Sequence, residues 1–282
     1  MLDWYFSRKR DMPWRGETDV YKIWLSEVML QQTQVETAKP YYHRWLTAFP
    51  DTKSVANASE EEVLKLWEGL GYYARARNFK SACEWIEHKN NGKIPIDSND
   101  FRQLKGVGDY IHAAVRSIAF NEVLPVIDGN VKRVVARILE LDSAPSKALS
   151  VIKEFLMREI SRESPGDFNQ AIMDLGSTIC KPKNPKCIEC NVHDFCKAYM
   201  HNSVDNYPLP EKKKKIPHHK IAVGLIWKEN KILISKRHSH VMLGGLWEFP
   251  GGKIKDAESA KECVRREIKE ELNVNVSVGK KI

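Results

Sequence analysis

The sequence contains no apolar stretch that approaches the ~18 residues a membrane-spanning helix requires. Residues 1–10 lack the apolar segment of a secretory signal peptide. No internal repeat is visible, and strand-like alternation is scarce before residue 200. These absences argue against an integral membrane protein, a secreted protein and a repeat architecture. We therefore expect a cytoplasmic protein.

The composition is that of a folded, basic protein. Of the 282 residues, 42% are hydrophobic and 29% are charged, so the chain can bury a core. At about 100–200 residues per domain, the length predicts two domains or one large domain. Lys and Arg number 45 against 37 Asp and Glu, which gives a net charge of +8. This excess favours an anionic partner such as nucleic acid, although charge alone does not establish one.

Helical spacing of apolar residues dominates the first 200 residues. The expected helices lie at 20–30, 36–49, 60–68, 72–88, 109–119, 130–140, 147–160 and 168–178. Residues 201–218, with prolines and four consecutive lysines, form a predicted linker.

The pattern changes after the linker. Residues 221–227 and 232–236 are predicted strands, 257–272 is a predicted helix, and valines alternate like another strand over 274–278. The sequence thus predicts a mainly α domain at 1–200 followed by a small α+β domain at 219–282. Because the second segment is short for a domain, we expect it to be the first part of a larger one.

Six cysteines are unevenly distributed. Cys83 and Cys263 each stand alone in a helical pattern and are expected to be buried thiols. The other four fall within 17 residues with the spacing C-x6-C-x2-C-x5-C, at Cys180, Cys187, Cys190 and Cys196. In a reducing compartment this cluster favours a metal site over disulfides. Four thiolates suit either tetrahedral zinc or a [4Fe–4S] cluster, and the spacing does not choose between them.

Two glycines flank an apolar residue in Lys105-Gly106-Val107-Gly108, directly before a predicted helix. Such a turn directs backbone N–H groups outward at a helix N-terminus, which can bind a phosphate without a cationic side chain. An ordinary turn between two helices is the alternative.

Two carboxylates stand in unusual surroundings. On a helix, Glu27 has Ile23, Trp24 and Leu30 as neighbours, and this apolar surface should raise its pKa towards that of a general acid. Asp128 follows an apolar run at the start of a predicted helix, where it can face developing positive charge. A solvated glutamate and a simple helix cap are the alternatives. Together the two would form the acid and carboxylate pair that glycosidic cleavage uses.

An acidic motif follows the linker: Gly252, five residues, Glu258, seven residues, and then Arg266 with Glu267, Glu270 and Glu271. Carboxylates on one helical face could hold Mg²⁺ on a diphosphate. Alternatively, Arg266 and Glu270 form an ordinary i,i+4 ion pair on a solvated surface.

Together these segments resemble the helix-hairpin-helix DNA glycosylase superfamily, specifically the adenine DNA glycosylases of the MutY type. The segments that carry the resemblance are Pro13-Trp14-Arg15, SEVMLQQTQV at 26–35, GLGYYARARN at 69–78, LKGVG at 104–108, VIDGNVKRV at 126–134 and the four clustered cysteines. The tail resembles the start of the MutT-like (Nudix) domain that follows in this family, with LGGLWEFPGGK at 243–253 as its signature.

The resemblance implies a base excision repair enzyme that flips adenine out of double-stranded DNA and hydrolyses its glycosidic bond. Glu27 would protonate adenine at N7, and Asp128 would stabilise the oxocarbenium ion, with Tyr110 and Asn130 supporting the site. The clustered cysteines, in a loop at 180–196, would bind a [4Fe–4S] cluster. The implied partner is DNA with adenine opposite 8-oxoguanine or guanine, and the implied state is a monomer.

The resemblance also implies a set of DNA-binding residues, among which Gln32 and Tyr72 would press into the duplex where the base leaves. The set is Arg15, Gln31, Gln32, Tyr72, Arg75, Arg77, Lys105, Gly106, Val107 and Gly108.

The chain departs from relatives in two places. Bifunctional relatives of the endonuclease III type carry a Schiff-base lysine where this chain has Tyr110, so we expect a monofunctional enzyme with weak strand cleavage. The family reads 8-oxoguanine with a later loop that this chain does not reach, so we expect a weaker lesion preference; His238-Ser239-His240 is in the wrong place to be that loop. Two alternatives remain: a Nudix-type pyrophosphohydrolase and a non-catalytic iron–sulfur DNA-binding protein.

Overall fold

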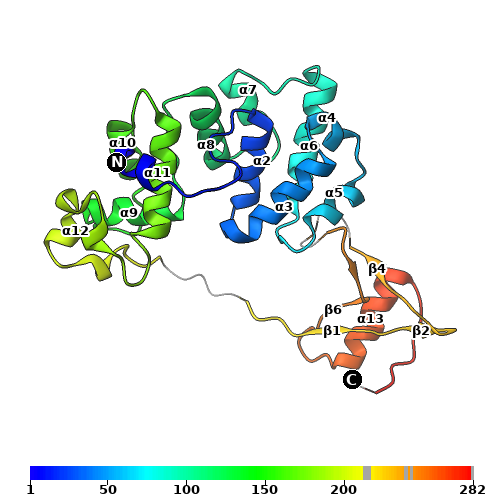
Figure 1. Ribbon diagram of the computed structural model, residues 1–282. Helices are drawn as coiled ribbons and strands as arrows, with labels where there is room; N and C mark the ends of the chain where they lie inside the picture. The colour runs from blue at the N-terminus through cyan, green and yellow to red at the C-terminus, as the bar shows by residue number, and fades with distance from the viewer. Residues whose placement is uncertain (212–216, 238–240, 242–243, 281–282) are drawn as a thin grey trace. The chain divides into compact units, whose positions relative to one another are not determined.

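The computed structural model describes residues 1–211, 217–237, 241 and 244–280 (Figure 1). Residues 212–216 of the predicted linker and the unassigned 238–240 therefore lie outside the described residues. Backbone contacts divide the chain into two compact units, residues 1–212 and 213–282. The first is helical and the second combines short strands with one helix, which confirms the predicted fold class.

The first unit is built from helices joined by short turns. They are α1 (Leu2–Arg8), α2 (Val20–Leu30), α3 (Val35–Ala48), α4 (Thr52–Asn57), α5 (Glu60–Trp67), α6 (Ala74–Lys89), α7 (Ser98–Gln103), α8 (Asp109–Phe120), α9 (Gly129–Leu139), α10 (Leu149–Glu159), α11 (Pro165–Thr178) and α12 (Lys197–Met200), with 3-10 turns η1 (Cys187–Glu189), η2 (His193–Phe195) and η3 (Val204–Asn206). The eight predicted helices are all present. The helices that periodicity missed, α1, α4, α7 and α12, span at most seven residues, too short to show a period of 3.6.

Two large hydrophobic clusters form most of the core of this unit, and a small third one consists of Ala113, Ala114 and Val126. The larger cluster is centred on α2, α3 and α6 and contains the fully buried Trp24, Trp45 and Trp67. The smaller of the two large clusters joins α9, α10 and α11. Helix α8 contacts both α2 and α11 (Figure 1). Residues on α8 can therefore meet residues from either cluster.

Helix α11 approaches its neighbours closely because two of its residues are glycines. A Cβ atom on Gly166 would lie 2.8 Å from the Cα of Ile118 and from the carbonyl oxygen of Ser117, both on α8. A Cβ atom on Gly176 would lie 2.6 Å from the Cβ of Asn130 on α9. These contacts involve backbone or the base of a side chain, so they cannot be relieved by a rotamer change.

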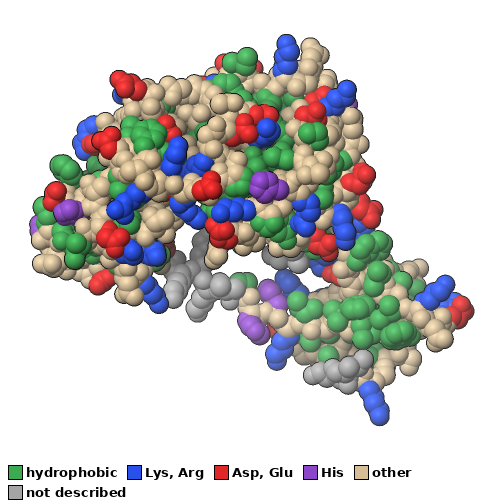
Figure 2. Space-filling model, in the orientation of Figure 1, with side chains coloured by type: hydrophobic (Ala, Val, Ile, Leu, Met, Phe, Trp, Pro, Cys, Tyr) green, Lys and Arg blue, Asp and Glu red, His purple; other side chains and the backbone are tan. Residues whose placement is uncertain are grey.

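The second unit pairs its strands as three short antiparallel ladders: β1 (Ile221–Val223) with β6 (Gly251–Lys253), β2 (Trp227–Lys228) with β3 (Lys231–Ile232), and β4 (Ser235–Lys236) with β5 (Trp247–Glu248). Helix α13 (Ala260–Leu272) starts at a capping box between Ser259 and Glu262 and packs Val264 and Ile268 against Ala222. Figure 2 shows apolar side chains gathered on the surface of this unit. Ile221, Val223, Trp227 and Trp247 are each more than half exposed.

The predicted strand at 274–278 is wrong. Residues 273–280 make no β ladder with any described residue. Val276 and Val278 instead pack, partly buried, against the small core under α13. Alternating burial is thus present, but alternation alone does not supply a partner strand.

No helix among the described residues is long and apolar enough to cross a membrane.

The close approach of α11 to α8 predicts a destabilising substitution. Gly166→Ala should lower the free energy of unfolding by about 1–3 kcal/mol, because the added methyl overlaps the α8 backbone. Gly129→Ala is the matched control. A Cβ there meets nothing within 4 Å, and alanine improves helix propensity by at most about 1 kcal/mol. Equal denaturation midpoints for the two variants would contradict the proposed role of Gly166.

Candidate active site

Glu27 is a buried carboxyl group on α2, with 5% of its surface exposed. The hydroxyl of Tyr110, on α8, donates a hydrogen bond of 2.7 Å to its Oε2 atom. Burial raises the pKa of Glu27, while the Tyr110 hydrogen bond and the charge of Arg15 lower it and the charge of Asp128 raises it further. A carboxyl group whose pKa is raised by burial in an apolar setting is suited to be a general acid.

Tyr110 is held as a neutral hydrogen-bond donor. Burial raises its pKa well above the usual value, and the charge of Glu27 adds to the effect. Its hydroxyl also lies 3.9 Å from the Sδ atom of Met173 on α11. The side chain thus fills the junction between α2, α8 and α11.

Asp128 is the N-cap residue of α9. Its Oδ1 accepts a 2.7 Å hydrogen bond from the Val131 N–H, and its Oδ2 accepts one of 3.1 Å from the Asn130 side chain. Burial raises the pKa of Asp128, whereas these two hydrogen bonds and the charge of Arg133 lower it. The sequence suggested either a helix cap or a partly buried carboxyl group at Asp128. The structure shows both at this residue.

The segment before Asp128 is fixed by Asn169 of α11, which is 1% exposed. The Asn169 Oδ1 atom accepts from the Val126 N–H at 3.0 Å, and its amide nitrogen donates to the Leu124 carbonyl at 2.8 Å and to the Ser117 hydroxyl at 2.9 Å. These bonds satisfy backbone groups that would otherwise be buried without partners. Sequence reasoning missed Asn169, because nothing local marks it.

Arg133 links the Asp128 region to the cysteine loop. Its guanidinium donates to the Asn130 side chain at 2.9 Å, to the Gly176 carbonyl at 2.7 Å and to the Cys180 carbonyl at 2.8 Å. A continuous set of hydrogen bonds therefore runs from Asp128 through Asn130 and Arg133 to the first clustered cysteine.

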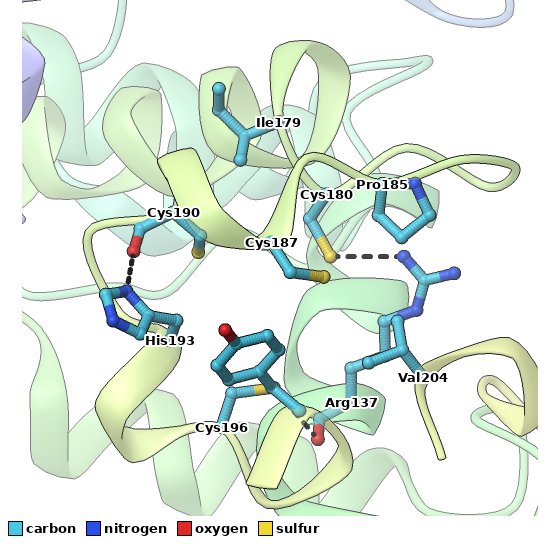
Figure 3. A pocket seen from close by; sticks show the side chains of 10 residues that line it. Arg137, Ile179, Cys180, Pro185, Cys187, Cys190, His193, Cys196 and Val204 are labelled. Atoms are coloured by element: carbon cyan, nitrogen blue, oxygen red, sulfur yellow. Dashed lines mark hydrogen bonds between the residues drawn. The ribbon is translucent and has the colours of Figure 1, made fainter. Parts of the chain in front are cut away.

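The four clustered cysteines, Cys180, Cys187, Cys190 and Cys196, line a single cavity (Figure 3). All six cysteines of the chain are free, and Cys83 and Cys263 are buried as predicted. Within the described residues, no three His, Cys, Asp or Glu side chains converge closely enough to hold one metal ion. The cysteines thus share a cavity without meeting at a point.

Arg137 closes one side of this cavity and is 2% exposed. It donates to the Cys180 Sγ atom at 3.3 Å and to the Lys181 carbonyl at 2.7 Å, and its own carbonyl accepts from the Cys196 thiol at 3.5 Å (Figure 3). The Arg137 guanidinium therefore supplies a hydrogen-bond donor to a sulfur atom inside the cavity.

The glycine turn lies between α7 and α8 as predicted. Gly106 adopts φ +87°, and a Cβ there would lie 2.8 Å from the Cβ of Asn78. Val107 is buried, Lys105 is exposed, and Gly108 is the N-cap of α8. The first N–H groups of α8 have no partner within the helix, so the turn offers the anion-binding geometry expected from its sequence.

Gln32 and Tyr72 lie on two surface loops that Arg75 holds together. Arg75 donates to the carbonyls of Val28, Met29 and Gln31 on one side and of Leu70 and Gly71 on the other, at 2.6–3.1 Å. Gln32 and Tyr72 are exposed and have positive φ angles of 56° and 47°. Their loops are therefore fixed, while their side chains remain available.

Three arginines expected at DNA have internal partners instead. Arg15 forms a buried ion pair of 2.9 Å with Asp174 and also donates to Gln170 and Tyr5. Arg75 donates its hydrogen bonds to backbone carbonyls of the two loops that carry Gln32 and Tyr72. The Nε atom of Arg77 donates to Glu60 at 3.0 Å. The guanidinium groups of Arg15 and Arg75 thus make hydrogen bonds within the fold, and the DNA contacts expected of these residues stay predictions.

The acidic motif of the second unit is organised around Arg266. This side chain pairs with Glu258 at 2.7 Å, Glu267 at 2.7 Å and Glu270 at 3.2 Å. Its hydrogen bond to Glu258 lowers the pKa of that carboxyl to about 2. The described residues bring no three of these carboxylates together as metal ligands, so this geometry does not favour the Mg²⁺ site considered for Glu267, Glu270 and Glu271.

Comparison with known proteins identifies two families in the chain. Residues 25–157 match the HhH-GPD superfamily base excision DNA repair protein, and residues 217–281 match the NUDIX domain. The chain is 33% identical to an adenine DNA glycosylase of Arabidopsis thaliana, over 99% of this chain and 51% of that protein. It is 34% identical to the adenine DNA glycosylase of Buchnera aphidicola from Schizaphis graminum, over 93% of this chain and 77% of that protein.

An adenine DNA glycosylase of Homo sapiens is 40% identical over 70% of this chain and 38% of its own length. The chain therefore spans about half, or less, of the length of its plant and animal relatives. Among solved structures, a thermostable thymine-DNA glycosylase superimposes with a TM-score of 0.66 at 26% identity, covering 71% of this chain and 93% of that one. A trapped endonuclease III–DNA covalent intermediate superimposes with a TM-score of 0.61 at 20% identity, over 71% of this chain and 92% of that one, which shows the shared fold.

The burial of Glu27 predicts that replacing it with an uncharged residue raises the free energy of unfolding, by an amount that depends on pH. Because burial raises its pKa, ionised Glu27 destabilises the folded state as pH rises above the ordinary value of 4.5. Glu27→Gln should therefore be more stable than the parent at neutral pH, by a difference that grows above that value at up to about 1.4 kcal/mol per pH unit. The exposed Glu61→Gln is the control. Urea denaturation between pH 4 and 8 tests this, and a difference that shrinks with rising pH would exclude the assignment.

Proposed function

This chain belongs to the adenine DNA glycosylases of the helix-hairpin-helix base excision repair superfamily, and on that basis we propose that it hydrolyses the N-glycosidic bond of adenine in double-stranded DNA. The observation that carries the proposal is the buried Glu27, held by Tyr110 and close enough to Asp128 for its charge to raise the Glu27 pKa. Burial raises the pKa of the first carboxyl, and the second lies at a helix N-terminus. This is the pairing that acid-assisted glycosidic cleavage requires.

In the proposed mechanism the adenine is first flipped out of the stack, at a cost of a few kcal/mol. Glu27 then protonates N7, because neutral adenine leaves poorly as an anion. Asp128 stabilises the cationic sugar as the bond breaks, and the hydrogen bonds from Val131 and Asn130 hold its carboxylate in place. Water completes the hydrolysis and leaves an abasic site.

Strand cleavage should be weak in this proposal. Tyr110 occupies the position at which bifunctional relatives carry a Schiff-base lysine, and its hydroxyl is committed to Glu27. A phenol cannot form an imine with the opened sugar.

The glycine turn and the two exposed loops are the proposed DNA-binding surface. Backbone N–H groups at the start of α8, with Lys105 beside them, would bind backbone phosphates. Gln32 and Tyr72 would press into the duplex where the base leaves, since their loops are fixed by Arg75. We propose adenine opposite 8-oxoguanine or guanine as the substrate pair.

We further propose that the clustered cysteines bind a [4Fe–4S] cluster. Zinc requires four ligands that converge on one ion, whereas in a [4Fe–4S] cluster each thiolate binds a different iron. Four cysteines that line one cavity without meeting at a point fit the second arrangement. The cluster would hold the 180–196 loop in its fold, and Arg137 would donate a hydrogen bond to the Cys180 sulfur.

A single-turnover assay tests the activity. Labelled duplexes with adenine opposite 8-oxoguanine, guanine or thymine are incubated with the protein, with and without hot alkali. We expect cleavage only after alkali and only for the two purine mispairs, and the ratio of their rates measures the lesion preference. Glu27→Gln should retain DNA binding and lose at least about 10²-fold in rate, as removal of a general acid does. Excision near the parent rate would remove Glu27 from this role.

The metal content tests the cluster. Anaerobically purified protein should contain about four irons and four sulfides per chain and show visible absorbance. Cys187→Ser should lower both, whereas Cys83→Ser, which alters a buried cysteine outside the loop, should lower neither. Stoichiometric zinc with no iron would overturn the proposal.

A further inference from the structure

Glu211, the last described residue before 212–216, is bound to the turn that precedes α10. Its Oε1 atom accepts a 3.0 Å hydrogen bond from the Ser146 N–H, and its Oε2 atom accepts one from the Ser146 hydroxyl. These hydrogen bonds, with the charges of Lys132 and Lys147, hold the pKa of Glu211 below its usual range. A backbone amide and a hydroxyl thus bind this carboxylate, and the charges of two lysines act on it. We call Ser146 and these two lysines the Ser146 niche.

The niche lies close to the proposed active site. Lys132 is in the first turn of α9, and its backbone N–H donates to the carbonyl of Asp128 at 3.0 Å. Four residues of helix separate the two along the axis by about 6 Å, which is close to two nucleotide rises of 3.4 Å in one DNA strand. Lys132 is therefore the lysine of the niche that lies nearest to Asp128 along the chain.

The donors of the niche suit a phosphate as well as they suit a carboxylate. Backbone N–H groups, serine hydroxyls and lysines are the groups that most often bind DNA phosphates. Ser146 and Lys147 are exposed, so the niche is open to a large ligand once the Glu211 side chain leaves. The Glu211 carboxylate stands where a phosphate oxygen pair would be.

We propose that the Ser146 niche is a binding site for a DNA backbone phosphate and that Glu211 occupies it in the free protein as an internal competitor. DNA must displace this carboxylate to reach Ser146, Lys132 and Lys147. Glu211 therefore weakens binding to every sequence alike, since a phosphate carries no base information. This inference rests on the DNA binding in the proposed function, but not on the glycosylase chemistry.

The test is the affinity for an undamaged, fluorescently labelled duplex, measured by anisotropy between 50 and 200 mM salt. Glu211→Gln should bind about two- to fivefold more tightly than the parent at low salt, the range for one screened ion pair. Its plot of log K against log salt should be steeper by up to about 0.9, the value for one added phosphate contact. Glu61→Gln, which makes the same charge change on α5, should show neither effect.

A second substitution, at Ser146, tests whether the change in DNA affinity arises at the niche. Ser146→Ala should weaken binding more in the Glu211→Gln background than in the parent, because in the parent its hydroxyl is already engaged by Glu211. Thermal denaturation of each variant verifies that it is folded.

The proposal is overturned if Glu211→Gln and Glu61→Gln have equal affinities and equal salt slopes. It is also overturned if Ser146→Ala has the same effect in both backgrounds.

If inorganic phosphate stabilises Glu211→Gln against heat while its DNA affinity is unchanged, the niche binds a small anion instead, and the DNA assignment is wrong. Failure of adenine excision with these affinity changes intact would refute the proposed function and leave the niche assignment standing. If the parent and Glu211→Gln both fail to bind DNA, the niche assignment and the proposed function are both refuted.

Discussion

The burial of one carboxyl group organises the site. Glu27 lies on α2 with 5% of its surface exposed, and the Tyr110 hydroxyl of α8 donates a hydrogen bond to it. A buried carboxyl group is tolerated only if it is protonated or well bonded. The contact between α2 and α8 therefore does more than pack two helices, since it places the Tyr110 hydroxyl as a hydrogen-bond donor on the carboxyl group on which the proposed chemistry depends. Arg15 and Asp128 act on the same carboxyl from other segments of the chain.

Helix α11 contacts the residues that position Glu27 and Asp128. Its Asn169 holds the segment that leads to Asp128, its Met173 contacts Tyr110, its Asp174 pairs with Arg15, and the carbonyl of its Gly176 accepts from Arg133. The glycines of α11 bring its backbone against α8 and α9. One helix thus sets the spacing between the proposed acid and the proposed carboxylate. The loop of clustered cysteines begins directly after it, so a shift in the loop would be passed to the same helix.

The second unit has a different character. Its acidic motif is ordered by Arg266, which pairs with three glutamates, and its strands leave large apolar side chains exposed. The pair between Glu258 and Arg266 joins α13 to the preceding loop, whereas Glu267 and Glu270 lie on the helix itself. Their present arrangement is that of a structural motif, and the chemistry proposed for the chain rests on the first unit.

The sequence alone was sufficient for whatever depends on neighbouring residues. The helical period, the glycine turn, the apolar face around Glu27, the cap at Asp128 and the cysteine spacing are all local, and each is present in the structure. The family resemblance placed Tyr110 and Asn130 at the site, but only the tertiary structure revealed which contacts these and the other residues make. Tyr110 and Glu27 are 83 residues apart, and Arg15 and Asp174 are 159 apart. No local pattern showed that Arg15 and Arg75 are internal or that Asn169 supports Asp128. The valines at 274–278 have a strand's alternation, but a strand exists only where another segment supplies hydrogen bonds. Periodicity and capping are properties of a segment, whereas the pairing of buried polar groups depends on which segments the packing brings together.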